Sequence, residues 1–418
     1  HCIFIYCIYI YIYKMNTDIT DKAMNGIETA TENFKNMLKD KNKWLLMYLI
    51  LIIVFIVWLI FWYIRNKLGL LNTNNLNMIS NLDSIKGSKI SNINSANASH
   101  KHLLRDYYMA SSYNSCCGGN SEKDFVDMVP LQKVIGRGAR LLDFEIYSID
   151  NNPVVAAGPE ATTNGKFCLK GTYNSLSLKK VMQQVRMRAF SGGAGGAPNP
   201  DDPLVLSFRI KTNNGNIYNS MANIMRQTFS GQFLSSKYNF EGKNNISGRD
   251  VIGNLPLLDL KRKVIIFCSD PNFNFRDTPF HEFVNISGKG KDGGGMPFAK
   301  THKNIDIVQT YDSKSLIEEN KKFLSITMPD FSKISLNPPA PIHHKFGCQW
   351  VMMNYSVVDA NFIYYNNFFA SSGSAFRLKP DHLRYFETIL PDPIKQDKRL
   401  TLGPKQLSFL GGAYKPLG

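Results

Sequence analysis

Three side chains in the first half of the chain carry oxygen atoms that could pair with a cationic side chain. Asn114 lies in the segment SSYN, while Asp143 and Glu145 alternate along the apolar segment ARLLDFEIY. Arg209 lies at the end of another apolar segment, and its guanidinium could pair with both carboxylates. The sequence favours a buried ion pair among these side chains.

The spacing of the cysteines, the histidines and the glycine- and lysine-rich run does not predict a second site. The cysteines occur without a CxxC pair, which argues against a disulfide framework or a zinc site and fits a reducing compartment. The glycine- and lysine-rich run at 286–298 lacks the spacing of a phosphate-binding loop and is predicted to be a basic linker. We expect surface or packing roles for the histidines, with 343 and 344 in a loop; they are His100, His102, His343, His344 and His382.

Short apolar segments alternate with helical patterns through residues 101–395. Helical periodicity predicts helices at 176–190 and 216–229. Buried strands that alternate with helices predict a parallel sheet covered by helices, and at this length a closed (β/α)8 barrel of the TIM type is the leading architecture. The expected strands lie at 139–147, 152–157, 202–210, 262–269 and 348–355.

A long apolar segment precedes this α/β region. Residues 44–64 carry no charged side chain, and a helix of this length spans the roughly 30 Å of a bilayer's hydrocarbon core. Aromatic residues lie near its ends and basic residues flank both, as is typical of membrane interfaces. The alternative is a buried core helix, but we predict a transmembrane helix over 44–64.

The segments on either side of this helix, and the C-terminus, are predicted to lie outside the barrel. Residues 1–43 form an N-terminal segment, of which 16–43 shows an amphipathic helical pattern. Residues 1–14 precede the first methionine, Met15, and are interpreted as processed or non-native sequence. Asparagine- and serine-rich composition predicts a flexible tether over 65–100, and residues 396–418 form a basic C-terminal tail.

The net charge of +16 and the pI of about 9.4 favour anionic partners, either an acidic membrane face or nucleic acid. A solvated basic surface is the alternative. More lysines precede the predicted membrane helix than follow it, which would place the barrel across the membrane from the cytosol. Glycosylation sequons at Asn97, Asn245 and Asn285 agree with that orientation, whereas the unpaired cysteines oppose it. The orientation is therefore left open.

Five segments resemble, in order, the two conserved halves of eukaryotic phosphoinositide-specific phospholipase C. They are SSYN (111–114), ARLLDFEIY (139–147), NPVVAAG (152–158), GCQWVMMNY (347–355) and FRLKPDHLR (376–384). The resemblance covers residues 108–386 and implies a barrel made of two halves. The linker between the halves is then expected at 286–304.

The resemblance also shows where the catalytic groups of that family would lie. The two histidines that serve as phosphate ligand and general acid would fall on Tyr113 and Ala157. Three calcium ligands would fall on Asn114, Asp143 and Glu145, with the two acidic types exchanged, and the fourth falls on Arg209. The positions that bind the inositol phosphates fall on Phe267, Ser269, Ile326 and Ser335, of which only the last keeps the family's residue type.

Because both histidines and one calcium ligand are replaced, the sequence favours a pseudoenzyme without a cofactor, although it leaves calcium binding open. We expect a membrane-anchored phospholipase C-like barrel that serves as a structural or interaction protein. Two alternatives remain, namely a binding module for anionic lipids such as phosphoinositides and an active phosphoric diester hydrolase with an altered site. Composition further suggests an AT-rich genome, such as that of a large DNA virus or a protist. The expected setting is then a single-pass protein of a virion membrane or of a membrane derived from the endoplasmic reticulum, with other virion proteins as partners.

Overall fold

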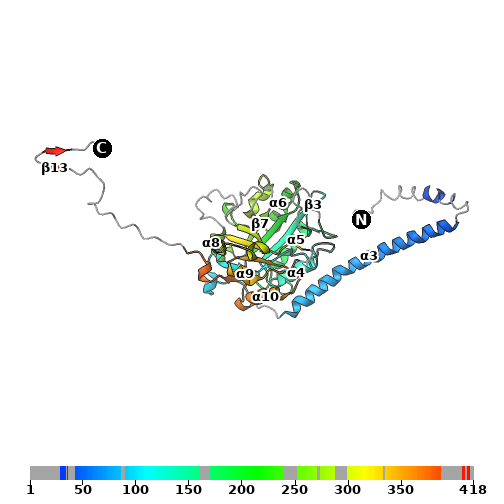
Figure 1. The fold of residues 1–418 in the computed structure, drawn as a ribbon, viewed down its shortest axis with the longest axis horizontal. Coiled ribbons are helices and arrows are strands. Elements are labelled where there is room, and N and C mark those ends of the chain that lie inside the picture. Colours follow the sequence, from blue (N-terminus) through cyan, green and yellow to red (C-terminus); the bar gives the residue numbers. More distant parts are fainter. Residues whose placement is uncertain are drawn as a thin grey trace.

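A computed structural model describes residues 29–33, 35, 43–85, 90–159, 170–238, 252–270, 274–287, 299–332, 335–386, 407–409 and 412–414. Figure 1 shows a long helix, α3 (Lys43–Ser84), that extends from a barrel formed by the middle of the chain. Most of the predicted N-terminal segment 1–43 lies outside the described residues. Of the predicted tail 396–418, only a hairpin of β13 (Leu407–Phe409) and β14 (Gly412–Tyr414) is described.

Eight parallel strands form a nearly closed barrel, which confirms the predicted (β/α)8 architecture. The order around the barrel is β8–β7–β6–β3–β2–β11–β10–β9, so that wall strands that follow one another in sequence pair with each other, except β8 and β9 at the two edges. A short antiparallel pair, β1 (Tyr107–Met109) with β12 (Phe376–Leu378), joins the beginning of the barrel to its end. The barrel strands are β2 (Ser111–Ser112), β3 (Leu141–Ile149), β6 (Leu204–Ile210), β7 (Val264–Ser269), β8 (Val284–Ser287), β9 (Ala299–Lys303), β10 (Leu324–Met328) and β11 (Trp350–Met353).

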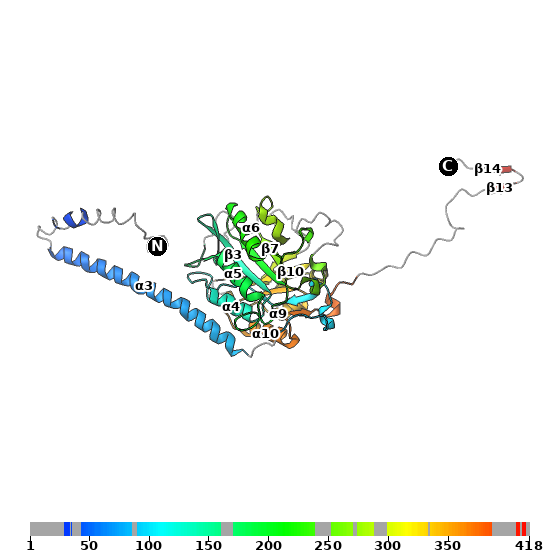
Figure 2. The ribbon, with the colours of Figure 1, turned by 180° about the vertical axis from the view of Figure 1, so that it is seen from behind.

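Helices cover the outside of the barrel, as the view from behind also shows (Figure 2). The helices predicted at 176–190 and 216–229 are confirmed as α5 and α6. Phe144 on β3 and Phe208 on β6 stack at 6.1 Å on the helix-facing side of the wall. The covering helices are α4 (Met128–Gly136), α5 (Leu178–Ala189), α6 (Asn216–Thr228), α7 (Asn304–Val308), α8 (Ser313–Lys322), α9 (Ala340–Lys345) and α10 (Ala360–Ser372).

The predicted strand at 152–157 belongs to a hairpin rather than to the barrel wall. β4 (Asn152–Ala156) runs antiparallel to β3, and β5 (Leu176–Ser177) pairs with its other edge. Asp150 and Asn151 connect β3 to β4 with φ angles of 49° and 60°, the left-handed conformation that the commonest two-residue hairpin loop requires. Because this turn returns the chain antiparallel to β3, no helix lies between the two strands. β4 therefore does not join the parallel wall.

The predicted linker at 286–304 overlaps two barrel strands. β8 continues to Ser287 and β9 begins at Ala299, so both ends of the expected linker belong to the wall. Its central part, 288–298, lies outside the described residues. β8 and β9 are also the two edges of the sheet, since no pairing joins them among the strands described. The two edge strands of the described sheet therefore lie on either side of residues 288–298, and the linker itself stays a prediction.

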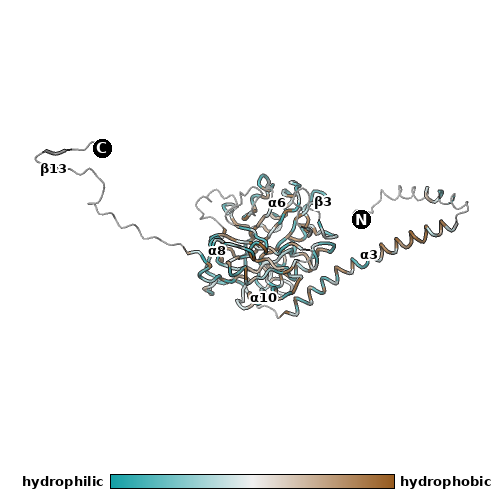
Figure 3. The backbone as a smooth tube through the Cα atoms, viewed as in Figure 1, coloured by the Kyte–Doolittle hydropathy of each residue, from teal (hydrophilic) through white to brown (hydrophobic). Residues whose placement is uncertain are grey.

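α3 is one continuous helix of 42 residues that contains the predicted span 44–64 and continues well beyond it. Figure 3 shows that its apolar part is the part that projects from the barrel. The most apolar window has a mean hydropathy of 3.0 and no buried residues. By length and composition, this one helix of the described chain could cross a membrane.

The flexible tether predicted over 65–100 is wrong. Helix α3 continues to Ser84, and its last three turns bury Met78 and Leu82 against the barrel. Beyond the helix, Ile90 and Ile93 are buried as well. Asparagine-rich composition hid a helix whose two fully buried apolar residues, Met78 and Leu82, lie four positions apart on the face that meets the barrel. The ordered domain therefore begins before residue 101.

Candidate functional site

The candidate site lies on β3 and near the carboxyl end of β6, toward the end at which a parallel barrel brings functional groups together. Since Phe144 and Phe208 face the helices, the alternation of side chains along each strand turns Asp143, Glu145 and Arg209 into the barrel. Glu145 and Arg209 are direct partners in the strand register. Asp143 and Glu145, from one predicted strand, therefore lie beside Arg209, from another.

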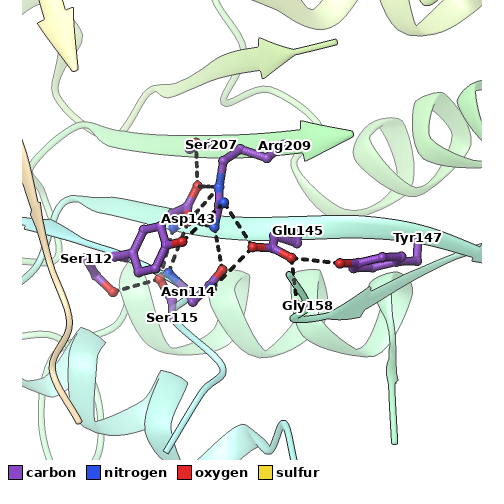
Figure 4. Close-up of polar contacts among 10 residues, drawn as sticks. Ser112, Asn114, Ser115, Asp143, Glu145, Tyr147, Gly158, Ser207 and Arg209 are labelled. Atoms are coloured by element: carbon purple, nitrogen blue, oxygen red, sulfur yellow. Dashed lines mark hydrogen bonds and ion pairs between the residues drawn. The ribbon is translucent and has the colours of Figure 1, made fainter. Parts of the chain in front are cut away.

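Arg209 forms the centre of a buried charge cluster (Figure 4). Its Nη2 lies 2.7 Å from Asp143 Oδ2, and its Nε donates to Asp143 Oδ1 at 3.0 Å. Its Nη1 lies 2.9 Å from Glu145 Oε1, and Nη2 also donates to Asn114 Oδ1 at 2.5 Å. The predicted pairing of Arg209 with the carboxylates is confirmed, and it includes the amide of Asn114 as well.

Hydrogen bonds from the surrounding chain satisfy the remaining carboxylate oxygens. Ser207 Oγ and the backbone N–H of Asn114 donate to Asp143 at 2.8 and 3.0 Å. Tyr147 Oη and the backbone N–H of Gly158 donate to Glu145 Oε2 at 2.9 and 3.0 Å. Besides the contacts with Arg209, each carboxylate therefore accepts hydrogen bonds from one side-chain hydroxyl and one backbone N–H.

The cluster is almost completely removed from solvent. The exposed fractions of Asp143, Glu145 and Arg209 are 0%, 2% and 8%. Burial alone would lower the pKa of Arg209, but Asp143, Tyr113 and Glu145 together hold that pKa well above its ordinary value. The guanidinium is therefore a permanent cation. Removal of either sign of charge would leave the other one buried without a partner.

Tyr113 lies over the guanidinium. The centre of the Arg209 guanidinium is 4.6 Å from the ring centroid, within the range of a cation–π contact. Burial raises the pKa of Tyr113 to about 12, although the neighbouring guanidinium lowers it. The phenol is therefore neutral at physiological pH, so it can donate a hydrogen bond but carries no positive charge with which to bind a phosphate.

The oxygen atoms that could bind a calcium ion are already occupied. Asn114 Oδ1, both oxygens of Asp143 and one of Glu145 contact the guanidinium of Arg209. A cation at the centre of these oxygens would lie within about 3 Å of a positive charge, which is strongly repulsive at low dielectric. Within the part of the chain that the structure describes, no group of three His, Cys, Asp or Glu side chains could hold a metal either. The residues present do not fit a calcium ion.

The other predicted site residues do not complete a polar binding site. Ala157 is fully buried, and its carbonyl accepts from the N–H groups of residues 171 and 172. Phe267 and Ile326 are buried apolar residues on β7 and β10. Ser269 pairs with Arg209 in the strand register. Ser335 is buried in the segment after β10, where its carbonyl accepts from Asn354.

Buried histidines occur on the outer layer of the barrel, not in the cluster. His343 and His344 lie on helix α9 rather than in the predicted loop, and both are buried. The ring of His344 packs 4.4 Å from Tyr108 and 4.3 Å from Phe368. Burial lowers the pKa of His344 to about 3, so the ring is neutral. The predicted packing role holds for this pair, although the predicted local structure was wrong.

Sequence reasoning missed the donors that support the two carboxylates. Ser207 lies two residues before Arg209, and Tyr147 lies two residues after Glu145. Both positions share the interior face of their strands, so the period of two could have identified them. The N–H of Gly158 had no such signal, because it reaches Glu145 only through the hairpin that the sequence did not predict.

Comparisons with known proteins agree with this architecture. Residues 100–269 match the family described as phosphatidylinositol-specific phospholipase C, X domain. No curated protein matches the chain. Among solved structures, the chain is similar to PLC21 of L. pealei, with a TM-score of 0.53 and 17% identity over 68% of this chain and 38% of that one. It is also similar to PLC21 of S. officinalis, with a TM-score of 0.53 and 16% identity over 70% and 39%.

At these identities, the likeness to the two solved structures shows the fold. The barrel is thus of the phospholipase C kind, and the resemblance noted in the sequence is confirmed at that level. The chain spans about two fifths of the length of either of these proteins.

Proposed function

We propose that this phospholipase C-type barrel does not hydrolyse phosphoinositides and serves as a membrane-anchored structural or interaction protein. The observation that carries the proposal is the position of Arg209. Its guanidinium lies among Asn114, Asp143 and Glu145, the three side chains that match calcium ligands in the resemblance. The protein has an internal cation where the family reaction needs an exchangeable one.

The acid–base groups are replaced as well. Tyr113 is neutral at physiological pH, and Ala157 has no side chain that could transfer a proton. A positioned general acid or base contributes roughly 10²- to 10⁴-fold to such a reaction. Loss of both histidines and of the metal leaves the scaffold without the groups that stabilise the leaving oxygen and the developing phosphate charge.

We expect no release of inositol phosphates when the purified full chain is incubated with vesicles that contain phosphatidylinositol or its phosphorylated forms. The same result is expected with calcium and with a chelator, because the ligand oxygens already bind Arg209. The assay should include an active phospholipase C as a control for substrate quality. Calcium-dependent release that disappears in Asn114→Ala would contradict the proposal.

Membrane anchoring rests on the apolar half of α3, where large side chains are exposed along most of 44–59. We expect the full chain to stay in the membrane pellet after extraction with alkaline carbonate. A matched variant with Ile52→Lys and Ile56→Lys should instead be released, because each charge at the centre of a span costs about 2.5–3.5 kcal/mol. If the unmodified chain were released into the supernatant, the anchor would be wrong. A virion membrane, or one derived from the endoplasmic reticulum, remains the predicted setting.

A further inference from the structure

Four N-x-S sequences occur in the chain, and the structure separates one of them from the others. Their asparagines are Asn97, Asn245, Asn285 and Asn354. In a folded protein, such an asparagine can carry a sugar only where its amide nitrogen is free and lies on the surface, because an N-linked glycan is bulky and hydrated. Asn245 lies outside the described residues, so the comparison concerns the other three.

The amides of Asn285 and Asn354 are used by the fold itself. Asn285 on β8 donates from Nδ2 to the carbonyl of Tyr238 at 3.1 Å, and its Oδ1 accepts from the N–H of Ile266 at 2.9 Å. Asn354, directly after β11, is buried and donates from Nδ2 to the carbonyl of Ser335 at 2.9 Å. A sugar on either nitrogen would displace these contacts, so the folded chain has no room for one at either position.

Asn97 has the opposite environment. It lies in the segment between α3 and β1, within a run of six exposed residues, 94–99. Its Oδ1 accepts from the N–H of Ser99 at 2.9 Å, and its Nδ2 has no hydrogen-bond partner among the described residues. This bond between Oδ1 and the second following N–H is the Asx turn that asparagine commonly forms. It fixes the side chain while the nitrogen that would take the sugar stays free.

The loop that carries Asn97 is held to the barrel at both ends. Ile93 and His100 are buried, and the N–H of Ile93 donates to Asp202 Oδ1 at 2.7 Å. The N–H of Asn94 donates to His100 Nδ1 at 3.1 Å, and Asn94 Oδ1 accepts from the N–H of Asn97 at 2.9 Å. These bonds close the loop on itself and leave its tip in solvent. A group attached to Nδ2 of Asn97 would therefore displace no packed side chain.

The unpaired cysteines oppose a barrel on the non-cytosolic side, where glycans are added, but their burial removes this objection. Cys116, Cys117, Cys268 and Cys348 are free and buried. Burial raises the pKa of each thiol, that of Cys348 to about 11, so almost no thiolate forms. Oxidation requires an accessible thiolate. These thiols are therefore stable in an oxidising compartment and do not indicate the cytosol.

The basic residues beside the membrane helix then decide the orientation. Four lysines precede the span, and two basic residues follow it within α3. They are Lys35, Lys39, Lys41 and Lys43 on one side and Arg65 and Lys67 on the other. Basic residues near a span stay on the cytosolic side. This excess places the residues before the span in the cytosol and the barrel on the opposite side.

From these observations we propose that the barrel lies on the non-cytosolic side of the membrane and carries an N-linked glycan on Asn97. The inference rests on the membrane anchor of the proposed function and adds an orientation and a modification site to it. The donor is an oligosaccharide linked to a lipid through pyrophosphate. The amide nitrogen of Asn97 forms a bond to C1 of the first sugar, and the bond from that carbon to the pyrophosphate breaks. The lipid pyrophosphate leaves, and the amide nitrogen gives up one proton to a base of the transferase.

The test is translation of the full chain in the presence of endoplasmic-reticulum microsomes. We expect protease added outside the microsomes to leave the barrel intact until detergent opens them. We also expect a slower-migrating form of the chain, which peptide N-glycosidase converts to the unmodified form. That enzyme changes the asparagine that carried the sugar to aspartate. Mass spectrometry of the tryptic peptide 90–101, after digestion in heavy-oxygen water, therefore shows whether position 97 was the site.

Variants of the loop test the site. Asn97→Gln and Ser99→Ala should each abolish the modification of position 97, because each destroys the acceptor sequence. Ser99→Thr keeps the acceptor sequence and should keep the glycan. Ser95→Ala is the matched control, since Ser95 is exposed in the same loop but lies outside the acceptor sequence.

A reversed bias of basic residues tests the orientation. One variant replaces the four lysines before the span by glutamine and adds Asn72→Lys and Asn77→Lys, at exposed positions of α3 after it. This chain should insert the other way, so that outside protease digests the barrel and position 97 stays unmodified. A matched variant with the same four lysines replaced by arginine keeps the bias and should keep both the protection and the glycan.

Alkaline carbonate extraction of the same microsomes separates this inference from the anchor on which it rests. In a chain that stays in the membrane pellet, digestion of the barrel by outside protease would overturn the orientation, and a protected barrel with an unmodified Asn97 would overturn the site. Release of the unmodified chain into the supernatant would instead remove the anchor of the proposed function, and the orientation with it.

Discussion

Replacement of Arg209 by alanine is expected to lower the free energy of unfolding by about 3–5 kcal/mol, the usual cost of removing one partner from a buried ion pair. The substitution leaves Asp143 and Glu145 with exposed fractions of 0% and 2% and without their cation. Their remaining donors are neutral groups, which stabilise a buried negative charge less than a guanidinium does. Denaturant unfolding, followed by circular dichroism, would measure the loss.

Two further variants make this expectation specific to the cluster. Arg226→Ala removes a guanidinium from an exposed pair with Glu282, where the atoms are 3.8 Å apart, and should cost less than about 1 kcal/mol. Adding Asp143→Asn and Glu145→Gln to Arg209→Ala should recover part of the lost stability, because no charge is then buried alone. An Arg209→Ala protein as stable as the unmodified one would show that the cluster is not a buried ion pair.

Leu82→Ala is expected to destabilise the barrel by about 2–5 kcal/mol, the range for truncating a fully buried leucine. Leu82 is completely buried although it lies in the segment that composition predicts to be a tether. If the end of α3 is part of the domain, the loss of this side chain leaves a cavity in the barrel's own core. The midpoint of cooperative unfolding should therefore fall.

The matched control is Leu76→Ala on the same helix. Leu76 has an exposed fraction of 65%, so its truncation should change the free energy of unfolding by no more than about 0.5 kcal/mol. If the Leu82→Ala protein unfolded at the same denaturant concentration as the Leu76→Ala protein, the end of α3 would not contribute to the stability of the barrel.

The charge cluster could be predicted because its members obey simple rules. Asp143 and Glu145 are two positions apart on one strand, and Arg209 ends the next parallel strand, so alternation and strand order together bring them to one face. The amide of Asn114 reaches the same guanidinium from a third strand end. Its φ of 42° is a left-handed conformation that asparagine tolerates better than most residues. That conformation had no signal in the sequence.

The helical tether could not be predicted from its composition. Asparagine is a weak helix former, and the stretch from 72 to 81 contains many asparagines. Here Asn74 and Asn75 are polar because they pair with carboxylates of the barrel, not because they face solvent. A sequence pattern records polarity but not the partner that satisfies it, so tertiary contacts decided the structure of this segment.

The most direct test of the central claim, that Arg209 takes the place of a calcium ion, is calorimetric titration of calcium into the unmodified full chain and into Arg209→Ala. We expect no saturable heat for the unmodified chain, since its ligand oxygens bind the guanidinium. In Arg209→Ala we expect a saturable calcium site, together with partial recovery of thermal stability when calcium is added. Saturable binding to the unmodified chain that is lost in Asn114→Ala would show instead that these oxygens bind calcium although Arg209 is present.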